Sequence, residues 1–179
     1  MQKSTARAKF RKLLSGPRFI LALGVWDPFT ARVAEAMGIE CVSLAGYQMG
    51  VGTVISEPLM TLTELAHICR YVTAAVDIPV FVDAGAGFGE PVHVMRTVKE
   101  LERTGVAGIH IEDQIFPKRV HYHKGIEHVV TREEMVDKIK AAVAAKTDPD
   151  FVITARTDAM ATDSFAEGVA RANLYLEAG

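Results

Sequence analysis

The chain has 179 residues, of which 49% are hydrophobic and 23% charged, as in ordinary globular proteins with a substantial core. Twenty basic and 22 acidic side chains give a formal net charge of −2, which argues against recruitment of nucleic acid or an acidic membrane by overall charge. No apolar run is long enough to cross a bilayer, so we expect no membrane partner. Cys41 and Cys69 have neither a CxxC nor a metal-ligand spacing and are expected to be buried, reduced thiols.

The first 26 residues carry basic side chains and no acids, and this composition admits two interpretations. A basic, acid-free start is typical of a transit peptide. The same segment has apolar residues on one side of a helix over about residues 4–14, namely Ala6, Phe10, Leu13 and Leu14. We favour the helix, and with it a cytoplasmic protein.

Short apolar runs then alternate with helical patterns at regular intervals. Each run is bounded by turn residues and is rich in Val and Ile, which predicts a strand buried on both faces. The runs are Phe19–Leu23, Cys41–Leu44, Pro79–Val82, Ala107–Ile111 and Phe151–Ala155.

Helix signals lie between these runs. Asp27 before Pro28 is typical of an N-cap followed by proline at the first helical position, and Gly38 ends that helix. Capping-box spacing predicts two more helix starts, because it satisfies two unpaired amides reciprocally. The expected helices begin at Asp27, at Thr61 (with Glu64), at Pro91 (apolar stripe Val94, Val98 and Leu101, end at Gly105), at Thr131 (with Glu134) and at about Asp163.

This alternation requires a parallel sheet, either an open doubly wound sheet or a closed barrel. Polar residues follow several different strands, as in barrel enzymes, and no GxGxxG or P-loop motif supports a nucleotide fold. We therefore expect residues 1–179 to form one incomplete (β/α)₈ TIM barrel of about five β/α units. The natural protein is expected to continue past Gly179.

Two acids at predicted strand ends suggest a metal site. Asp83 precedes a glycine-rich turn and Glu112 ends the next strand, with His110 on the same face and Asp113 on the opposite one. Two neighbouring acids repel each other unless a cation compensates, and Mg²⁺ prefers one or two carboxylates. The alternatives are an Asp83 that caps its turn and a Glu112 at a solvated strand end. Asp113 is expected to orient the loop or bind a backbone amide.

A third strand ends at Arg156, whose planar cation suits a carboxylate or a developing enolate. The alternative is a salt bridge to Asp158 or Glu112. A loop with much cationic and titratable character follows the fourth strand and could close over an anionic substrate, or be merely exposed and polar. Its members are Lys118, Arg119, His121, His123, Lys124 and His128.

Together these motifs resemble the isocitrate lyase/phosphoenolpyruvate mutase superfamily, in its methylisocitrate lyase and carboxyphosphonoenolpyruvate phosphonomutase branches. The resemblance rests on residues 83–89, 111–119 and 155–159 and extends from Asp27 to Gly179. It implies a (β/α)₈ barrel about a hundred residues longer than this chain, Mg²⁺ or Mn²⁺, an enolpyruvate-like intermediate and a homotetramer.

Residue by residue, the resemblance implies that Asp83 and Glu112 serve the metal and that Arg156 contacts substrate oxygens. It also implies a carboxylate site at the backbone of Ala45, Gly46 and Tyr47. The substrate-binding set is therefore Ala45, Gly46, Tyr47, Asp83 and Arg156.

The chain departs from the family pattern at four places. Gly85 stands where a second aspartate is usual, and Ala45 where Ser or Thr is frequent. Ser56 and Glu57 stand near another usual aspartate, which Glu57 could replace. Val120 stands where the lyase branch has an acidic cysteine, and valine cannot donate a proton.

His121, Tyr122 or His123 could supply that proton instead, because imidazole titrates near neutral pH. The catalytic candidates are therefore Arg156, His121, His123 and Lys118. The expected function is a Mg²⁺-dependent carbon–carbon lyase acting on a small 2-hydroxy or 2-oxo carboxylate. The alternatives are a phosphonomutase, an oxaloacetate decarboxylase or hydrolase, and a degenerate barrel that only binds its ligand.

Overall fold

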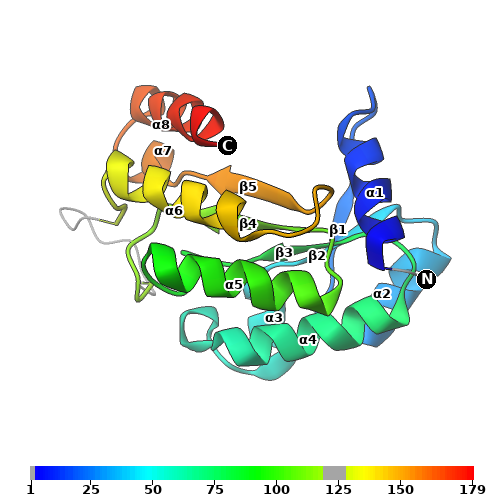
Figure 1. Cartoon of the computed structure of the whole chain (residues 1–179). Coiled ribbons are helices and arrows are strands. Elements are labelled where there is room, and N and C mark those ends of the chain that lie inside the picture. Colours follow the sequence, from blue (N-terminus) through cyan, green and yellow to red (C-terminus); the bar gives the residue numbers. More distant parts are fainter. Residues whose placement is uncertain (1–2, 119–127) are drawn as a thin grey trace.

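The computed structural model describes residues 3–118 and 128–179 and contains one five-stranded parallel sheet (Figure 1). The strands pair in chain order, each with the next along the chain. They are β1 (Ala22–Gly24), β2 (Cys41–Leu44), β3 (Val80–Asp83), β4 (Gly108–Glu112) and β5 (Val152–Arg156). A doubly wound sheet reverses its strand order at a switch point, whereas a barrel wall does not. The sheet therefore has the order of a barrel wall, as predicted.

The helices were predicted at most of their observed positions. Capping boxes open α2 at Asp27, α4 at Thr61 and α6 at Thr131, and Gly105 ends α5 with φ of 95°. Figure 1 shows α4, α5, α6 and α8 as neighbouring helices in a row along the sheet. The helices are α1 (Lys3–Leu14), α2 (Pro28–Ala36), α3 (Gly46–Thr53), α4 (Leu62–Ala75), α5 (Pro91–Thr104), α6 (Arg132–Ala145), α7 (Ala159–Thr162) and α8 (Phe165–Ala178), with a 3₁₀ turn η1 (Glu57–Leu59).

The core lies between the sheet and these helices. Val94, Val98 and Leu101 of α5 form the predicted stripe and are fully buried. Cys41 and Cys69 are buried free thiols, as expected, and burial raises the pKa of each to about 12. Among the described residues, no helix is long and apolar enough to span a membrane.

The helix α1 covers the amino-terminal ends of the strands. Phe10 is buried there and its ring lies 5.4 Å from that of Phe81, centroid to centroid. The buried Arg7 side chain donates to the carbonyls of Val106 and Glu102 and forms an ion pair with Asp148 at 2.7 Å. The opposite, carboxyl-terminal edge of the sheet is the one that carries the polar residues of interest.

The prediction for the first strand was wrong in part. It begins at Ala22 instead of Phe19, and it is not buried on both faces, since Leu23 is 39% exposed. The strand β5 is not buried on both faces either, because Thr154 and Arg156 are exposed. The reason is position, because β1 and β5 each pair with one strand and are the outer strands of the sheet. The sequence also left α3, η1 and α7 unpredicted. The segment of α3 contains three glycines, and its N-cap, Ala45, makes no capping bond through its side chain.

Candidate active site

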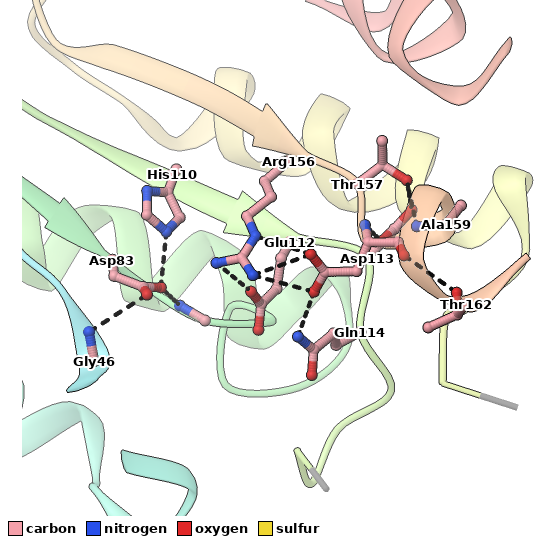
Figure 2. Close-up of polar contacts among 12 residues, drawn as sticks. Gly46, Asp83, His110, Glu112, Asp113, Gln114, Arg156, Thr157, Ala159 and Thr162 are labelled. Carbon is pink, nitrogen blue, oxygen red and sulfur yellow. Dashed lines mark hydrogen bonds and ion pairs between the residues drawn. The ribbon is translucent and has the colours of Figure 1, made fainter. Parts of the chain in front are cut away.

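The carboxyl ends of β3, β4 and β5 bring three predicted residues together (Figure 2). Glu112 and Arg156 are register partners on adjacent strands, and Asp83 pairs with His110 across β3 and β4. The alternating direction of side chains along a strand explains why His110 and Glu112 both belong to this site. The proximity of Asp83, Glu112 and Arg156 is therefore a consequence of sheet register.

Asp83 is held firmly as an ionised carboxylate. Its Oδ1 accepts a hydrogen bond from the Gly85 amide at 2.8 Å and lies 3.0 Å from His110 Nε2. Its Oδ2 accepts a longer bond, 3.4 Å, from the Gly46 amide. Although burial opposes ionisation, His110 and the Gly85 amide keep the pKa of Asp83 well below its ordinary value. The bond to Gly85 also confirms that Asp83 stabilises its own turn.

Glu112 is fully buried and lies between two cations. Lys118 Nζ lies 3.0 Å from Oε1 and Arg156 Nη1 lies 3.2 Å from Oε2. Both contacts are ion pairs without the alignment of a hydrogen bond, so within the described residues neither oxygen receives one. Burial raises the pKa of Glu112 above its ordinary value, and the charge of Lys118 only partly offsets this. A solvated strand end, the alternative considered above, is wrong.

Lys118 connects Glu112 to Glu57, which the sequence analysis named only as a possible replacement for a usual aspartate. Its ammonium group donates to both carboxylate oxygens of Glu57, at 2.9 and 3.0 Å. Burial opposes its charge, but the two glutamates raise the pKa of Lys118 above its ordinary value. Lys118 is therefore a charged member of the site, and Glu57 enters from η1.

Glu57 also occupies the space beside the unusual glycine. Gly85 has φ of +53°, and a Cβ built on it would have Glu57 Oε1 as its nearest neighbour, at 4.0 Å. A side chain at position 85 would therefore point toward the carboxylate that Glu57 already places there. Glu57 was expected only to replace the aspartate usual before Thr61, and the structure in addition places its carboxylate beside Gly85.

Arg156 makes both of the salt bridges that were considered as alternatives to a ligand contact. Its Nε donates to Asp158 Oδ1 at 3.0 Å, and its Nη1 lies against Glu112. Burial opposes its charge, and Glu112 and Asp158 raise the pKa of Arg156. The side chain is nevertheless 41% exposed, so the guanidinium still has a face available to a ligand.

The backbone at Ala45, Gly46 and Tyr47 lies beside these side chains. Gly46 begins α3, and its amide points at Asp83 (Figure 2). Helix amino termini attract negative charge through their unpaired amides. The Tyr47 side chain itself is 82% exposed, so any role of this residue in the buried part of the site would belong to its backbone.

Two hollows adjoin the cluster. A small one, of about 40 Å³, is lined by the glycine-rich turn with Gly46, Glu57, Asp83 and Lys118. A more open cavity of about 520 Å³ lies beside it, between α3 and Arg156. Glu57 and Lys118 line both hollows. Asp83 lines only the small one and Arg156 only the larger one, while the buried Glu112 lines neither.

The predicted loop after β4 is described only in part, so the structure does not test the proposed proton donors. His121, His123, Tyr122 and Val120 lie outside the described residues. His128, from the same predicted loop, is buried instead of exposed. Asp113 points away from the site and accepts a hydrogen bond from the Asp158 amide at 3.0 Å, as predicted for a residue that orients a loop.

Asp83 and Glu112 are the acids that the sequence analysis assigned to a metal. Among the described residues, no group of three or more His, Cys, Asp or Glu side chains is arranged around a common metal position. This does not exclude Mg²⁺, which takes one or two carboxylates and completes its shell with water and substrate oxygens. The buried, unbonded oxygens of Glu112 fit such a cation.

Comparison with known proteins identifies the group to which the site belongs. The sequence model of the phosphoenolpyruvate phosphomutase family matches residues 10–179. The chain is 43% identical over 175 residues to 2,3-dimethylmalate lyase of Eubacterium barkeri, covering 96% of this chain and 60% of that protein. It is 44% identical over 170 residues to 2-methylisocitrate lyase of Aeropyrum pernix, covering 94% and 54%.

An oxaloacetate decarboxylase of Rhodopseudomonas palustris (strain BisB18) is 39% identical over 176 residues, covering 97% of this chain and 60% of that protein. The chain thus spans about 54–60% of the length of these relatives.

Solved structures give the same result. A phosphoenolpyruvate phosphomutase from Streptomyces platensis subsp. rosaceus superimposes with a TM-score of 0.92 at 30% identity, covering 97% of this chain and 61% of that one. A phosphonopyruvate hydrolase in complex with oxalate and Mg²⁺ has a TM-score of 0.87 at 30% identity, covering 100% and 61%. The chain therefore belongs to the phosphoenolpyruvate phosphomutase family, within the phosphoenolpyruvate mutase/isocitrate lyase superfamily.

Proposed function

We propose that this chain carries the metal and enolate site of a Mg²⁺-dependent carbon–carbon lyase. The substrate is a small 2-hydroxy or 2-oxo carboxylate, cleaved through an enolpyruvate-like intermediate. The observation that carries this proposal is the fully buried Glu112, whose oxygens lack a hydrogen bond within the described residues and lie between two cations, Lys118 and Arg156. Relatives named as lyases support the reaction class.

Asp83 and Glu112 would hold the divalent cation, Mg²⁺ or Mn²⁺. When bound, the metal supplies positive charge that stabilises negative charge developing on a substrate oxygen. The low pKa of Asp83 keeps that ligand ionised. The structurally similar phosphonopyruvate hydrolase, which was solved in complex with oxalate and Mg²⁺, supports this choice of ion.

The remaining groups bind and orient the substrate. The amides at the start of α3, around Gly46 and Tyr47, favour its carboxylate, and the open face of Arg156 stabilises the enolate oxygen. Lys118, held between Glu57 and Glu112, contributes a second positive charge. We assign the proton donor to His121 or His123, a proposal that rests on the sequence alone.

A decarboxylase is the second candidate, and two observations favour it. Val120 replaces the cysteine of the lyase branch, and the chain is 39% identical to an oxaloacetate decarboxylase. Decarboxylation also produces a pyruvate enolate, so the same cation and Arg156 would serve it. Phosphonomutase or hydrolase activity remains a further alternative, as does a degenerate barrel that binds without turnover.

The metal assignment is tested with Asp83→Ala and, as control, Asp137→Ala, an exposed acid on α6. Mn²⁺ binding is measured by titration calorimetry, which does not depend on turnover. We expect the affinity to fall by more than about tenfold in Asp83→Ala, or about 1.4 kcal/mol, and to be unchanged in the control. Equal affinity in the two variants would refute the metal site.

The reaction is tested by pyruvate release from a panel of 2-hydroxy and 2-oxo acids incubated with the protein. Alkyl-substituted malates and methylisocitrate probe the lyase, oxaloacetate the decarboxylase, and phosphonopyruvate the hydrolase. Release from a substituted malate supports the primary proposal, and release from oxaloacetate alone replaces it with the second. Metal-dependent binding of oxalate with no turnover of any compound would identify the degenerate barrel.

A further inference from the structure

Asp113 follows the metal-site residue Glu112 in sequence but lies on the other side of the strand. Its carboxylate is completely buried. Its Oδ1 accepts a hydrogen bond from the Asp158 amide at 3.0 Å. Its Oδ2 accepts from Thr157 Oγ1 at 2.7 Å, from the Tyr175 hydroxyl at 2.9 Å and from Arg171 Nη1 at 3.2 Å. A buried carboxylate is costly unless its oxygens are paired, so these four donors stabilise one arrangement strongly.

The first two donors belong to the turn that follows Arg156. Thr157 and Asp158 connect β5 to α7, and Figure 2 shows this turn beside Asp113. The Asp113 amide in addition donates to the Arg156 carbonyl at 3.2 Å. Asp113 therefore fixes the backbone that directly follows the Arg156 side chain.

The turn at Thr157 and Asp158 in turn orients the guanidinium of Arg156. Asp158 accepts hydrogen bonds from Arg156 Nε at 3.0 Å and Nη2 at 3.3 Å. The Gln114 side chain donates to the same Asp158 carboxylate. Residues 112, 113 and 114 thus act on Arg156 in three ways: through an ion pair, through the backbone and through Asp158.

The two remaining donors come from the helix α8. Arg171 and Tyr175 are one turn apart, and Arg171 Nη1 donates to the Tyr175 hydroxyl at 3.1 Å and to the Val130 carbonyl at 2.8 Å. Arg171 Nε is also held by Glu167 at 2.8 Å. Tyr175 is 2% exposed, and water therefore has little access to replace it.

We infer that Asp113, with Arg171 and Tyr175, is a positioning unit that holds Arg156 in its ligand-facing orientation from the opposite side of the sheet. An arginine side chain carries about 2 kcal/mol of rotamer entropy, so holding it before the ligand arrives strengthens binding. None of the three residues reaches the site itself. The inference rests on the proposed function in one respect, which is that the ligand of Arg156 is a carboxylate substrate.

Tyr175→Phe is the first test, because it removes one buried hydroxyl and keeps the ring. The readout is solvent exchange of the Arg156 Nε–H signal in ¹⁵N NMR of this chain, with the signal assigned by its loss in Arg156→Lys. We expect exchange to be about tenfold faster in Tyr175→Phe, equivalent to about 1.4 kcal/mol. Oxalate affinity in the presence of Mg²⁺ should fall by a similar factor, while Mn²⁺ affinity without oxalate stays constant.

Thr104→Val is the matched control, since it also removes one buried hydroxyl, which donates to the Leu101 carbonyl within α5. It should leave the Arg156 signal unchanged. A second pair of variants changes Thr157 in the turn. Thr157→Val should accelerate exchange of the Arg156 Nε–H, whereas Thr157→Ser, which keeps the hydroxyl, should leave the exchange rate as in the unaltered chain. Unchanged Arg156 exchange in Tyr175→Phe and Thr157→Val would overturn the inference. Absence of oxalate binding in the unaltered chain would instead count against the proposed function, because the NMR comparison needs no ligand.

Discussion

Neighbouring residues of one strand have opposite roles in this protein. Glu112 faces the cations of the candidate site, while Asp113 faces α8 and the turn after β5. The two-residue period of a strand accounts for this division, and it was predictable from the sequence. The partners of Asp113 were not, since Arg171 and Tyr175 lie about sixty residues further along the chain.

A residue-scale prediction concerns Glu167, which is paired with Arg132 and Arg171. These two arginines lower the pKa of Glu167 from 4.5 to about 2. A carboxyl group whose pKa is lower when folded contributes stability above its unfolded pKa, and that contribution is lost as pH falls from about 4.5 toward 2. We expect Glu167→Gln to be less stable than the unaltered chain at pH 6, and the difference to shrink by pH 3. Urea unfolding at both values checks this, and a pH-independent difference would contradict it.

At the scale of elements, the helices that could be predicted are those with strong local signals. Thr61 and Thr131 form the capping boxes that their spacing indicated, and the stripe on α5 is buried as its period required. The helix α3 has no such signal, because Gly46, Gly50 and Gly52 weaken helix propensity and Ala45 does not cap it. Its formation therefore depends on packing at the strand ends.

An element-scale prediction compares two apolar residues on α5. Leu101 is fully buried and Val92 is 76% exposed. We expect Leu101→Ala to lower the free energy of unfolding by about 2–5 kcal/mol, because it removes buried methyl groups and leaves a cavity. Val92→Ala should change it by less than about 0.5 kcal/mol. Similar losses in both variants, measured by urea unfolding, would show that α5 does not pack through this stripe.

At the scale of the whole molecule, the buried contacts of Arg7 and the candidate site lie at opposite ends of the sheet. Arg7 on α1 closes the amino-terminal end through Val106, Glu102 and Asp148. Asp83, Glu112 and Arg156 lie at the carboxyl-terminal end, where barrel enzymes gather their catalytic groups. The two ends share no direct partner in these contacts.

A whole-molecule prediction follows for Arg7→Met. The change leaves Asp148 and two carbonyls without their donor, and we expect a loss of about 3 kcal/mol in the free energy of unfolding. Mn²⁺ affinity should remain that of the unaltered chain, because distant sites without shared partners act independently. Urea unfolding and calorimetric titration measure the two quantities. A fall in metal affinity in the folded variant would show that the ends are coupled.

The sequence by itself determined the order of the five strands, the helices with strong local signals, and the placement of Asp83, Glu112 and Arg156 at strand ends. Each depends on short-range signals: apolar runs, capping pairs, and polar residues placed where a strand ends. The tertiary structure alone decided that Phe19 and Leu21 are exposed ahead of β1, that Glu57 reaches Lys118, and that Tyr175 supports Asp113. These depend on which distant segments the sheet register and helix packing bring within a few ångströms, and no local pattern in the chain encodes such distances.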